Sequence, residues 1–192
     1  MSTISSTSVF TPEDLLSLPD DRRYELVGGK LVERPVSALS SLVASIVSRI
    51  LWEFVERNRL GCVFDPDLTY QCFPADPNLV RRPDVSFIRK GRFEGNRLPE
   101  GHVRIAPDLV VEVISPNEKA YDVDEKVELY RAAAVRLIWI INPVARTVHV
   151  YGANLRGAVL RGEDALDGAD VLPGFSCPLR EIFAKVDAAL AS

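Results

Sequence analysis

Apolar and polar residues alternate with different periods along the chain, and each period predicts an element. Apolar side chains recur every three or four residues from Val36 to Leu60, which predicts one long helix that ends at Gly61. Short alternating runs on both sides of Gly28-Gly29 predict a β-hairpin. Weak alternation over residues 62–72 and the run PDVSFIRK predict two strands, followed by a charged loop.

Two later segments contain almost no polar residues, APDLVVEVISP and RLIWIINP. Such runs predict strands that are buried on both faces. A helix is expected between them over residues 118–134, with Asn117 as its cap. The run RTVHVYG is expected to pair with the second strand across a turn at Asn142-Pro143.

Short helices are predicted at both ends of the chain, one capped by Thr11 and one over PLREIFAKVDAAL. The order of elements then predicts a mixed α/β fold, with a mixed sheet flanked by helices and an N-terminal β-hairpin. We expect one domain over residues 11–192, preceded by a loose segment of residues 1–10.

Composition narrows the class of protein. The chain has 192 residues, 47% of them apolar and 26% charged, which is ordinary for a globular domain. No uninterrupted apolar run reaches the length of a membrane span and the N-terminus lacks a signal-peptide pattern, so we expect a cytoplasmic protein without membrane contact. Three cysteines without a Cys-x-x-Cys pattern and two histidines argue against disulfide and zinc frameworks.

Charge is unevenly distributed. The net charge is −4, which is not typical of a nucleic-acid-binding protein. Residues 80–104, however, contain seven basic and three acidic side chains. Such a stretch can follow a phosphate backbone, although a solvated loop explains it as well.

Glu112 lies in the middle of the most apolar predicted strand, where a carboxylate is costly unless it is paired or bound to a cation. Asp108 falls on the same face of that strand, because side chains alternate. Asp84 opens the preceding strand. If the two strands are neighbours, the carboxylates converge, and such an oxygen-only site suits Mg²⁺ or Mn²⁺.

A stripe on the predicted helix at 118–134 supplies a cation. Asp122, Lys126 and Tyr130 are four residues apart and therefore share one face, which can point back toward Glu112. Each residue also has a purely structural interpretation: a buried Glu112–Lys126 ion pair, an Asp84 paired with Arg82, or a turn capped by Asp108. The functional hypothesis depends on the whole set.

These motifs resemble the Uma-two family of restriction-endonuclease-like proteins, which belongs to the PD-(D/E)XK nuclease-like superfamily. The resemblance rests on RPDVSF, APDLVVEVISP, the Asp-x3-Lys-x3-Tyr of DVDEKVELY, LIWIINP and the hairpin YELVGGKLVE, and covers residues 11–185. It implies a restriction-endonuclease-like core in which Asp84 and Glu112 hold a metal ion. Ile114 stands where the superfamily has a lysine, and the resemblance implies that Lys126 takes its place.

The first hypothesis is a Mg²⁺- or Mn²⁺-dependent DNA endonuclease with Asp84, Glu112 and Lys126 as catalytic residues. Asp108 and Glu25 are expected to add a ligand or a supporting contact, Tyr130 to belong to the same stripe, and Gln71 and Arg82 to position phosphate. We expect duplex DNA as partner and a homodimer, because duplex cutters are often twofold, and no organic cofactor.

The second hypothesis is a catalytically degenerate nuclease-like module that binds nucleic acid or a protein. The acidic pI, Ile114 and the absence of the family's histidine at the start of the long helix, where VSALSSLVAS has only serines and apolar residues, favour it. A Ser-His-Asp hydrolase is a third hypothesis, which the absence of Gly-x-Ser-x-Gly disfavours.

Overall fold

A six-stranded mixed sheet forms the centre of the protein, which is described here by a computed structural model over residues 9–116, 118–152 and 157–191. The strands lie in the order β3-β4-β5-β6-β7-β8, and only β5 and β6 are parallel among these neighbours. Their bounds are β3 Gly61–Phe64, β4 Val85–Arg89, β5 Leu109–Val113, β6 Leu137–Asn142, β7 Thr147–Tyr151 and β8 Gly157–Arg161.

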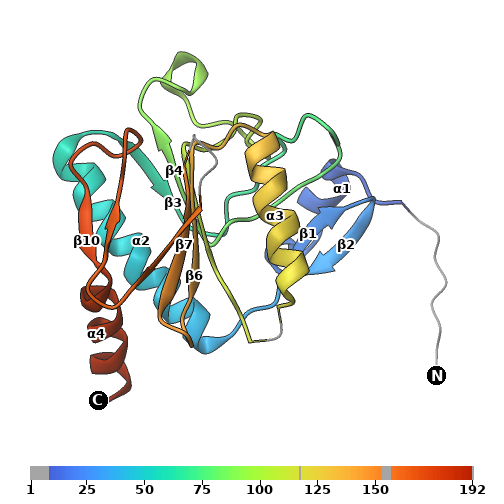
Figure 1. The fold of residues 1–192 in the computed structure, drawn as a ribbon. Coiled ribbons are helices and arrows are strands. Elements are labelled where there is room, and N and C mark those ends of the chain that lie inside the picture. Colours follow the sequence, from blue (N-terminus) through green and yellow to red (C-terminus); the bar gives the residue numbers. More distant parts are fainter. Residues whose placement is uncertain (1–8, 117, 153–156, 192) are drawn as a thin grey trace, which may run out of the picture.

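Helices cover both faces of the sheet (Figure 1). Helices α2 (Ala38–Asn58) and α4 (Leu179–Leu190) pack on one face, over a core that includes Trp139 and Phe175. Helix α3 (Ala120–Ala132) packs on the other face, over a second core. The expected layered fold is confirmed, including the central position of the apolar strand β5, whose five residues are all buried.

Small elements complete the fold. Helix α1 (Pro12–Leu16) begins with the predicted Thr11 cap, and strands β1 (Tyr24–Val27) and β2 (Lys30–Glu33) form the predicted hairpin. Both turn glycines have positive φ, 55° at Gly28 and 72° at Gly29, as a tight hairpin requires. Short strands β9 (Ala165–Asp167) and β10 (Ser176–Pro178) pair with each other, and 3₁₀ turns lie at Asp21–Arg23 and Glu94–Asn96.

Helix α2 confirms the long apolar period, but its end differs from the prediction. The helix is closed by Arg59 in the left-handed conformation (φ 53°), and Gly61 instead begins β3. A side chain at Gly61 would bring its Cβ to 2.1 Å from the Ile88 carbonyl oxygen, so glycine is needed for close approach of the strands. By length and composition alone α2 could span a membrane. Its buried apolar residues belong to the core on this face of the sheet.

The strand predicted over residues 62–72 was too long. Strand β3 ends at Phe64, and residues 65–72 form a loop in which Tyr70 makes isolated bridges to Arg81 and Val103. Strands β8, β9 and β10 were not predicted. The N-cap of α3 is Lys119. Asn117, which was expected to cap it, and residues 1–8 of the expected loose segment lie outside the described residues.

Candidate active site

Asp84 and Glu112 meet where β4 begins and β5 ends. Strand β4 pairs with β5 antiparallel, with Val85 opposite Val111. The next position in the same register sets Asp84 across from Glu112, at the spacing of neighbouring strands, about 5 Å. Asp84 Oδ2 also accepts a hydrogen bond from the Val113 N–H at 2.8 Å. The expected adjacency of these two strands is therefore confirmed.

Helix α3 brings its predicted stripe onto Glu112. Lys126 Nζ lies 3.2 Å from Glu112 Oε2, and the Tyr130 hydroxyl donates to Glu112 Oε1 at 2.6 Å. Lys126 Nζ also lies 2.8 Å from Glu118 Oε1. Asp122 lines the same cavity as Lys126 and Glu118. Glu112 thus sits between a cation and a hydroxyl that both come from α3.

Arg34 binds the other carboxylate of the pair. Its Nη2 donates to Asp84 Oδ1 at 2.7 Å, and both side chains are mostly buried. Pro35, the next residue, lines two cavities: one of about 550 Å³ that reaches Asp84, and one of about 370 Å³ that reaches Lys126. The short segment between β2 and α2 therefore separates the two approaches to the carboxylates.

Burial and like charge shift the acids at the centre. Burial raises the pKa of Glu112 to about 7; Lys126 opposes this rise, while Asp84 and Glu25 add to it. Burial also raises the pKa of Asp84, against the Val113 N–H and Arg34, which lower it. For Lys126, burial lowers the pKa, but Glu112, Glu25 and Glu118 together raise it above its ordinary value. Negative charge is thus concentrated here, a situation that a bound cation relieves.

Glu25 lies close to this cluster but has structural partners of its own. Arg81 Nη1 donates to Glu25 Oε2 at 2.9 Å, and the Arg82 N–H donates to Glu25 Oε1 at 2.8 Å. These contacts tie the hairpin to the segment before β4 that contains Asp84, and the bridge between Leu26 and Val80 adds to them. Glu25 also lines the cavity of Lys126. Its contacts fit the expected supporting role.

Arg82, Asp108 and Gln71 are not brought to the carboxylate pair. The Arg82 guanidinium is fully buried and binds Tyr24 O, Asp67 O and Asp21. Asp108 lies at the opposite end of β5, where its Oδ2 accepts from the Arg89 N–H and from Arg92, each at 2.9 Å. Gln71 Nε2 donates to the Pro77 carbonyl. We therefore assign structural contacts to these three residues.

The basic stretch of residues 80–104 does not form one surface. Arg81 and Arg82 are buried in ion pairs, and Arg92 binds Asp108. The loop that follows β4 leaves the sheet at the end remote from Asp84, five strand residues away, or about 17 Å. These basic side chains are close in sequence, but the fold places them apart, so they do not form one basic patch.

Serines occupy the start of α2, the place where the sequence analysis noted that this chain has no histidine. Ser40 is buried, and its Oγ lies 3.0 Å from Ser115 Oγ, which donates to the Pro35 carbonyl at 2.6 Å. Ser37 caps the helix through the Ser40 N–H. This hydroxyl network joins the end of β5 to the start of α2 and fixes the approach to Asp84.

Arg34 and Glu118 are site residues that the sequence analysis missed. Glu118 lies between the buried strand and α3, close in sequence to the predicted stripe that contains Lys126. This position could have indicated that Glu118 contacts Lys126. Arg34 follows the hairpin, and its sequence neighbourhood gives no sign that it reaches Asp84, fifty residues away.

The donors of the site suit a hard divalent cation. The described residues contain no group of three or more His, Cys, Asp or Glu side chains that could hold a metal ion. Mg²⁺ is nevertheless commonly bound through one or two carboxylates while it keeps several waters. Asp84 and Glu112 each retain acceptor positions beyond the two contacts made to each of them. A two-carboxylate Mg²⁺ site therefore fits the residues present.

Comparison with known proteins agrees with the fold. A family named Uma2 and described as "Putative restriction endonuclease" matches residues 12–180. A crystal structure from Anabaena variabilis, described as "a putative nuclease belonging to DUF820", has a TM-score of 0.76 and 23% identity, and covers 91% of this chain and 98% of its own. No match was found among curated proteins. Because the family match spans most of its length, the chain belongs to the Uma2 family of restriction-endonuclease-like proteins.

Proposed function

We propose that this protein is a metal-dependent endonuclease that hydrolyses phosphodiester bonds in DNA. The observation that carries the proposal is the convergence of Asp84 and Glu112 at one point of the sheet, with Lys126 3.2 Å from Glu112. Two acids and a lysine are what metal-assisted phosphodiester hydrolysis needs: ligands for the ion and a positive group near the phosphate.

Asp84 and Glu112, with a backbone carbonyl of β5, are the proposed ligands of Mg²⁺ or Mn²⁺. The ion would supply the positive charge that lowers the pKa of a water and offsets the charge of the scissile phosphate. The Tyr130 hydroxyl orients Glu112 by donating to its Oε1. The chain therefore holds one ligand rigidly before any ion binds.

Lys126 and Arg34 are the proposed contacts to water and phosphate. Lys126 Nζ has three donors and two carboxylate partners, so one donor can orient the attacking water or stabilise the negative charge that develops on the phosphate. Arg34 lies beside Asp84 and is planar and always charged, which suits a phosphate oxygen. The charged groups of Lys126 and Arg34 both reach the carboxylate pair from outside the six-stranded sheet.

The proposal is tested by incubating the protein with supercoiled plasmid in Mg²⁺, Mn²⁺ or EDTA. We expect metal-dependent nicking that Asp84→Asn and Glu112→Gln abolish, with Asp108→Asn as a matched control that retains it. Sedimentation of the same samples tests the expected homodimer. Nicking that survives in both site variants would overturn the proposal.

A catalytically degenerate binding module is the second candidate. It is favoured by Ile114 in place of the strand lysine and by the chain's own cations on Asp84 and Glu112. A bound ion stabilises the native protein, by about 2.7 kcal/mol at a hundredfold excess over its Kd. No nicking together with no rise in melting temperature in Mn²⁺ would select this candidate.

A further inference from the structure

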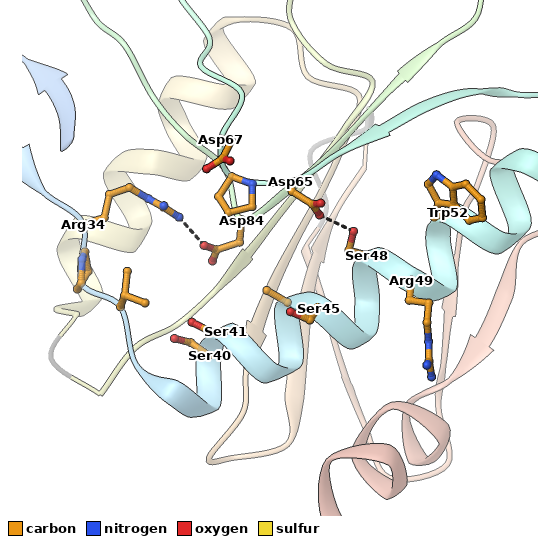
Figure 2. A pocket seen from close by; sticks show the side chains of 14 residues that line it. Arg34, Ser40, Ser41, Ser45, Ser48, Arg49, Trp52, Asp65, Asp67 and Asp84 are labelled. Carbon is orange, nitrogen blue, oxygen red and sulfur yellow. Dashed lines mark hydrogen bonds and ion pairs between the residues drawn. The ribbon is translucent and has the colours of Figure 1, made fainter. Parts of the chain in front are cut away.

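A groove runs from Asp84 along α2, between the helix and the loop that follows β3 (Figure 2). Its volume is about 550 Å³. Arg34 and Asp84 lie at one end, and Trp52 lies at the other, further along the helix. The groove therefore begins at the proposed reaction centre and leads away from it.

The floor of the groove is formed by side chains of α2 that are small except at Arg49 and Trp52. Ser40, Ala44, Ser48 and Trp52 are four residues apart, and Ser41, Ser45 and Arg49 form a parallel row that also lines it. The apolar side of the helix packs on the sheet. From Ser40 to Trp52 the first row extends about 18 Å.

Trp52 is half exposed, at 51%, whereas Trp139 is fully buried. A large aromatic side chain in water is a platform on which a base can stack, at about 1–3 kcal/mol per base. Arg49 lies one residue-row away in the same groove, its guanidinium is exposed, and its ion pair with Glu53 is long, at 3.9 Å. Both residues line the groove, and because the Arg49 guanidinium points away from Trp52 (Figure 2), the tryptophan ring is the surface at the far end on which a base can stack.

The charges of the groove fit base edges better than a duplex backbone. Asp65 accepts a hydrogen bond from Ser48, Asp67 pairs with Arg22 at 3.3 Å, and Asp84 pairs with Arg34. The lining is therefore mixed in sign, without the excess of positive charge that tracks phosphates. Carboxylates and hydroxyls bind the amino groups of bases, and only an unpaired base can be splayed out to stack on a tryptophan.

We propose that this groove binds an unpaired stretch of the nucleic-acid strand next to the cleavage position, with one base stacked on Trp52. The inference rests on the proposed function for the source of the strand, which would enter at Asp84. It revises the expected preference for duplex DNA: the substrate would be single-stranded, or a duplex with an unpaired flap or junction.

The test uses Trp52 as its own reporter, because the only other tryptophan, Trp139, is buried. The full chain is titrated in EDTA with a 12-nucleotide single strand and, separately, with the matching duplex. We expect the single strand to quench the tryptophan fluorescence and to bind at least about tenfold more tightly than the duplex. Anisotropy of a labelled strand measures the affinity of variants that lack the reporter.

Substitutions distinguish the contribution of the Trp52 ring to strand binding from a general effect on the fold. Trp52→Ala should weaken single-strand binding about 5- to 150-fold, which is the stacking energy expressed as an affinity ratio, and Trp52→Phe should retain most of it. Ser45→Leu should weaken binding by filling the groove. Val144→Ala, a matched loss of an exposed apolar side chain outside the groove, should change nothing.

Equal binding by Trp52→Ala, or tighter binding of the duplex, would overturn the inference. A change in sedimentation of Trp52→Ala without a loss of strand binding would also overturn it, and would assign the groove to a second protein copy. The titrations are made in EDTA, where metal-dependent cleavage does not occur, so the loss of strand binding by Trp52→Ala is measured separately from nicking. Failure of the proposed function would appear in the plasmid assay, and failure of this proposal in the titration.

Discussion

The two ends of the β4–β5 strand pair both carry buried acids, and they differ in how those acids are neutralised. At one end Asp108 accepts from the Arg89 N–H and from Arg92, and it stands alone. At the other end Asp84 and Glu112 share one point of the register and are held by cations from two other elements. The first arrangement completes a turn, whereas the second concentrates charge beside cavities that reach it.

A buried carboxylate on a strand is therefore an ambiguous signal. Asp108 directly precedes the apolar strand β5, Glu112 lies within it, and both are less than 10% exposed. What distinguishes them is convergence with a second acid and the access of a ligand, not burial. Substitutions at each end of the strand pair test this difference.

Removing the cation at the converging end should have the largest effect. Lys126→Met takes away the charge that we assign to the water or the phosphate, and we expect turnover on plasmid to fall at least about 100-fold. Lys185→Met, an exposed lysine of α4, is the matched control. A Lys126→Met variant that cuts at the parental rate would reduce the converging end to a structural ion pair.

Removing the acid at the other end should affect stability alone. Asp108→Asn weakens the contacts with Arg89 N–H and Arg92, and we expect the free energy of unfolding to fall by about 1–3 kcal/mol. Denaturant titration measures the loss, and the nicking rate per folded molecule should stay unchanged. A large loss of turnover in this variant would show that both ends serve the reaction.

The pH dependence of stability should reveal Glu112. Burial raises its pKa to about 7 from an ordinary value of 4.5, so the native state binds a proton that the unfolded state has released between these pH values. Its contribution to stability is therefore fully present below about pH 4.5 and is lost as the pH rises through 7. Glu112→Gln should gain about 1–3 kcal/mol on the parent between pH 4 and pH 8. Denaturant titrations across this pH range measure the difference in free energy of unfolding between Glu112→Gln and the parent. A difference that does not change with pH would contradict the raised pKa of Glu112.

The smallest effect on DNA binding is expected from a substitution in the loop between β4 and β5. Arg97 is exposed in the basic stretch at the end of the sheet remote from Asp84. A phosphate contact adds about 0.9 to the slope of binding against the logarithm of salt concentration. We expect Arg97→Ala to leave that slope unchanged. A decrease of the slope by about one would show that Arg97 contacts a phosphate and that DNA binds at this end of the sheet.

Local patterns predicted the elements well where a single face or burial state dominates. The uniform apolarity of LVVEVI and LIWII and the period of α2 were sufficient for the central strands and the long helix. Strand β8 was missed because its residues are mostly exposed at the edge of the sheet, so no burial pattern marks it. The end of α2 was predicted too late in the chain because Arg59 closes the helix with a positive φ, a conformation that an arginine in the sequence does not indicate.

The candidate site was predictable to the extent that strand adjacency and helix spacing determine it. Asp84, Glu112, Lys126 and Tyr130 follow from those two rules. Arg34 does not, since its contact with Asp84 depends on how the hairpin is docked through Glu25 and Arg81. Arg82 was assigned to phosphate because a run of basic residues gives no information on which side chains the fold buries.

The parallel pairing of β5 and β6 also determines from where a positive charge can reach Glu112. Parallel neighbours require a crossover, and here the crossover is α3, which passes over the sheet face that Glu112 occupies. A cation on the inner side of that helix reaches the acid as directly as one two residues further along the strand. Isoleucine at position 114 therefore still leaves Glu112 with a positive charge beside it, because Lys126 supplies that charge from α3.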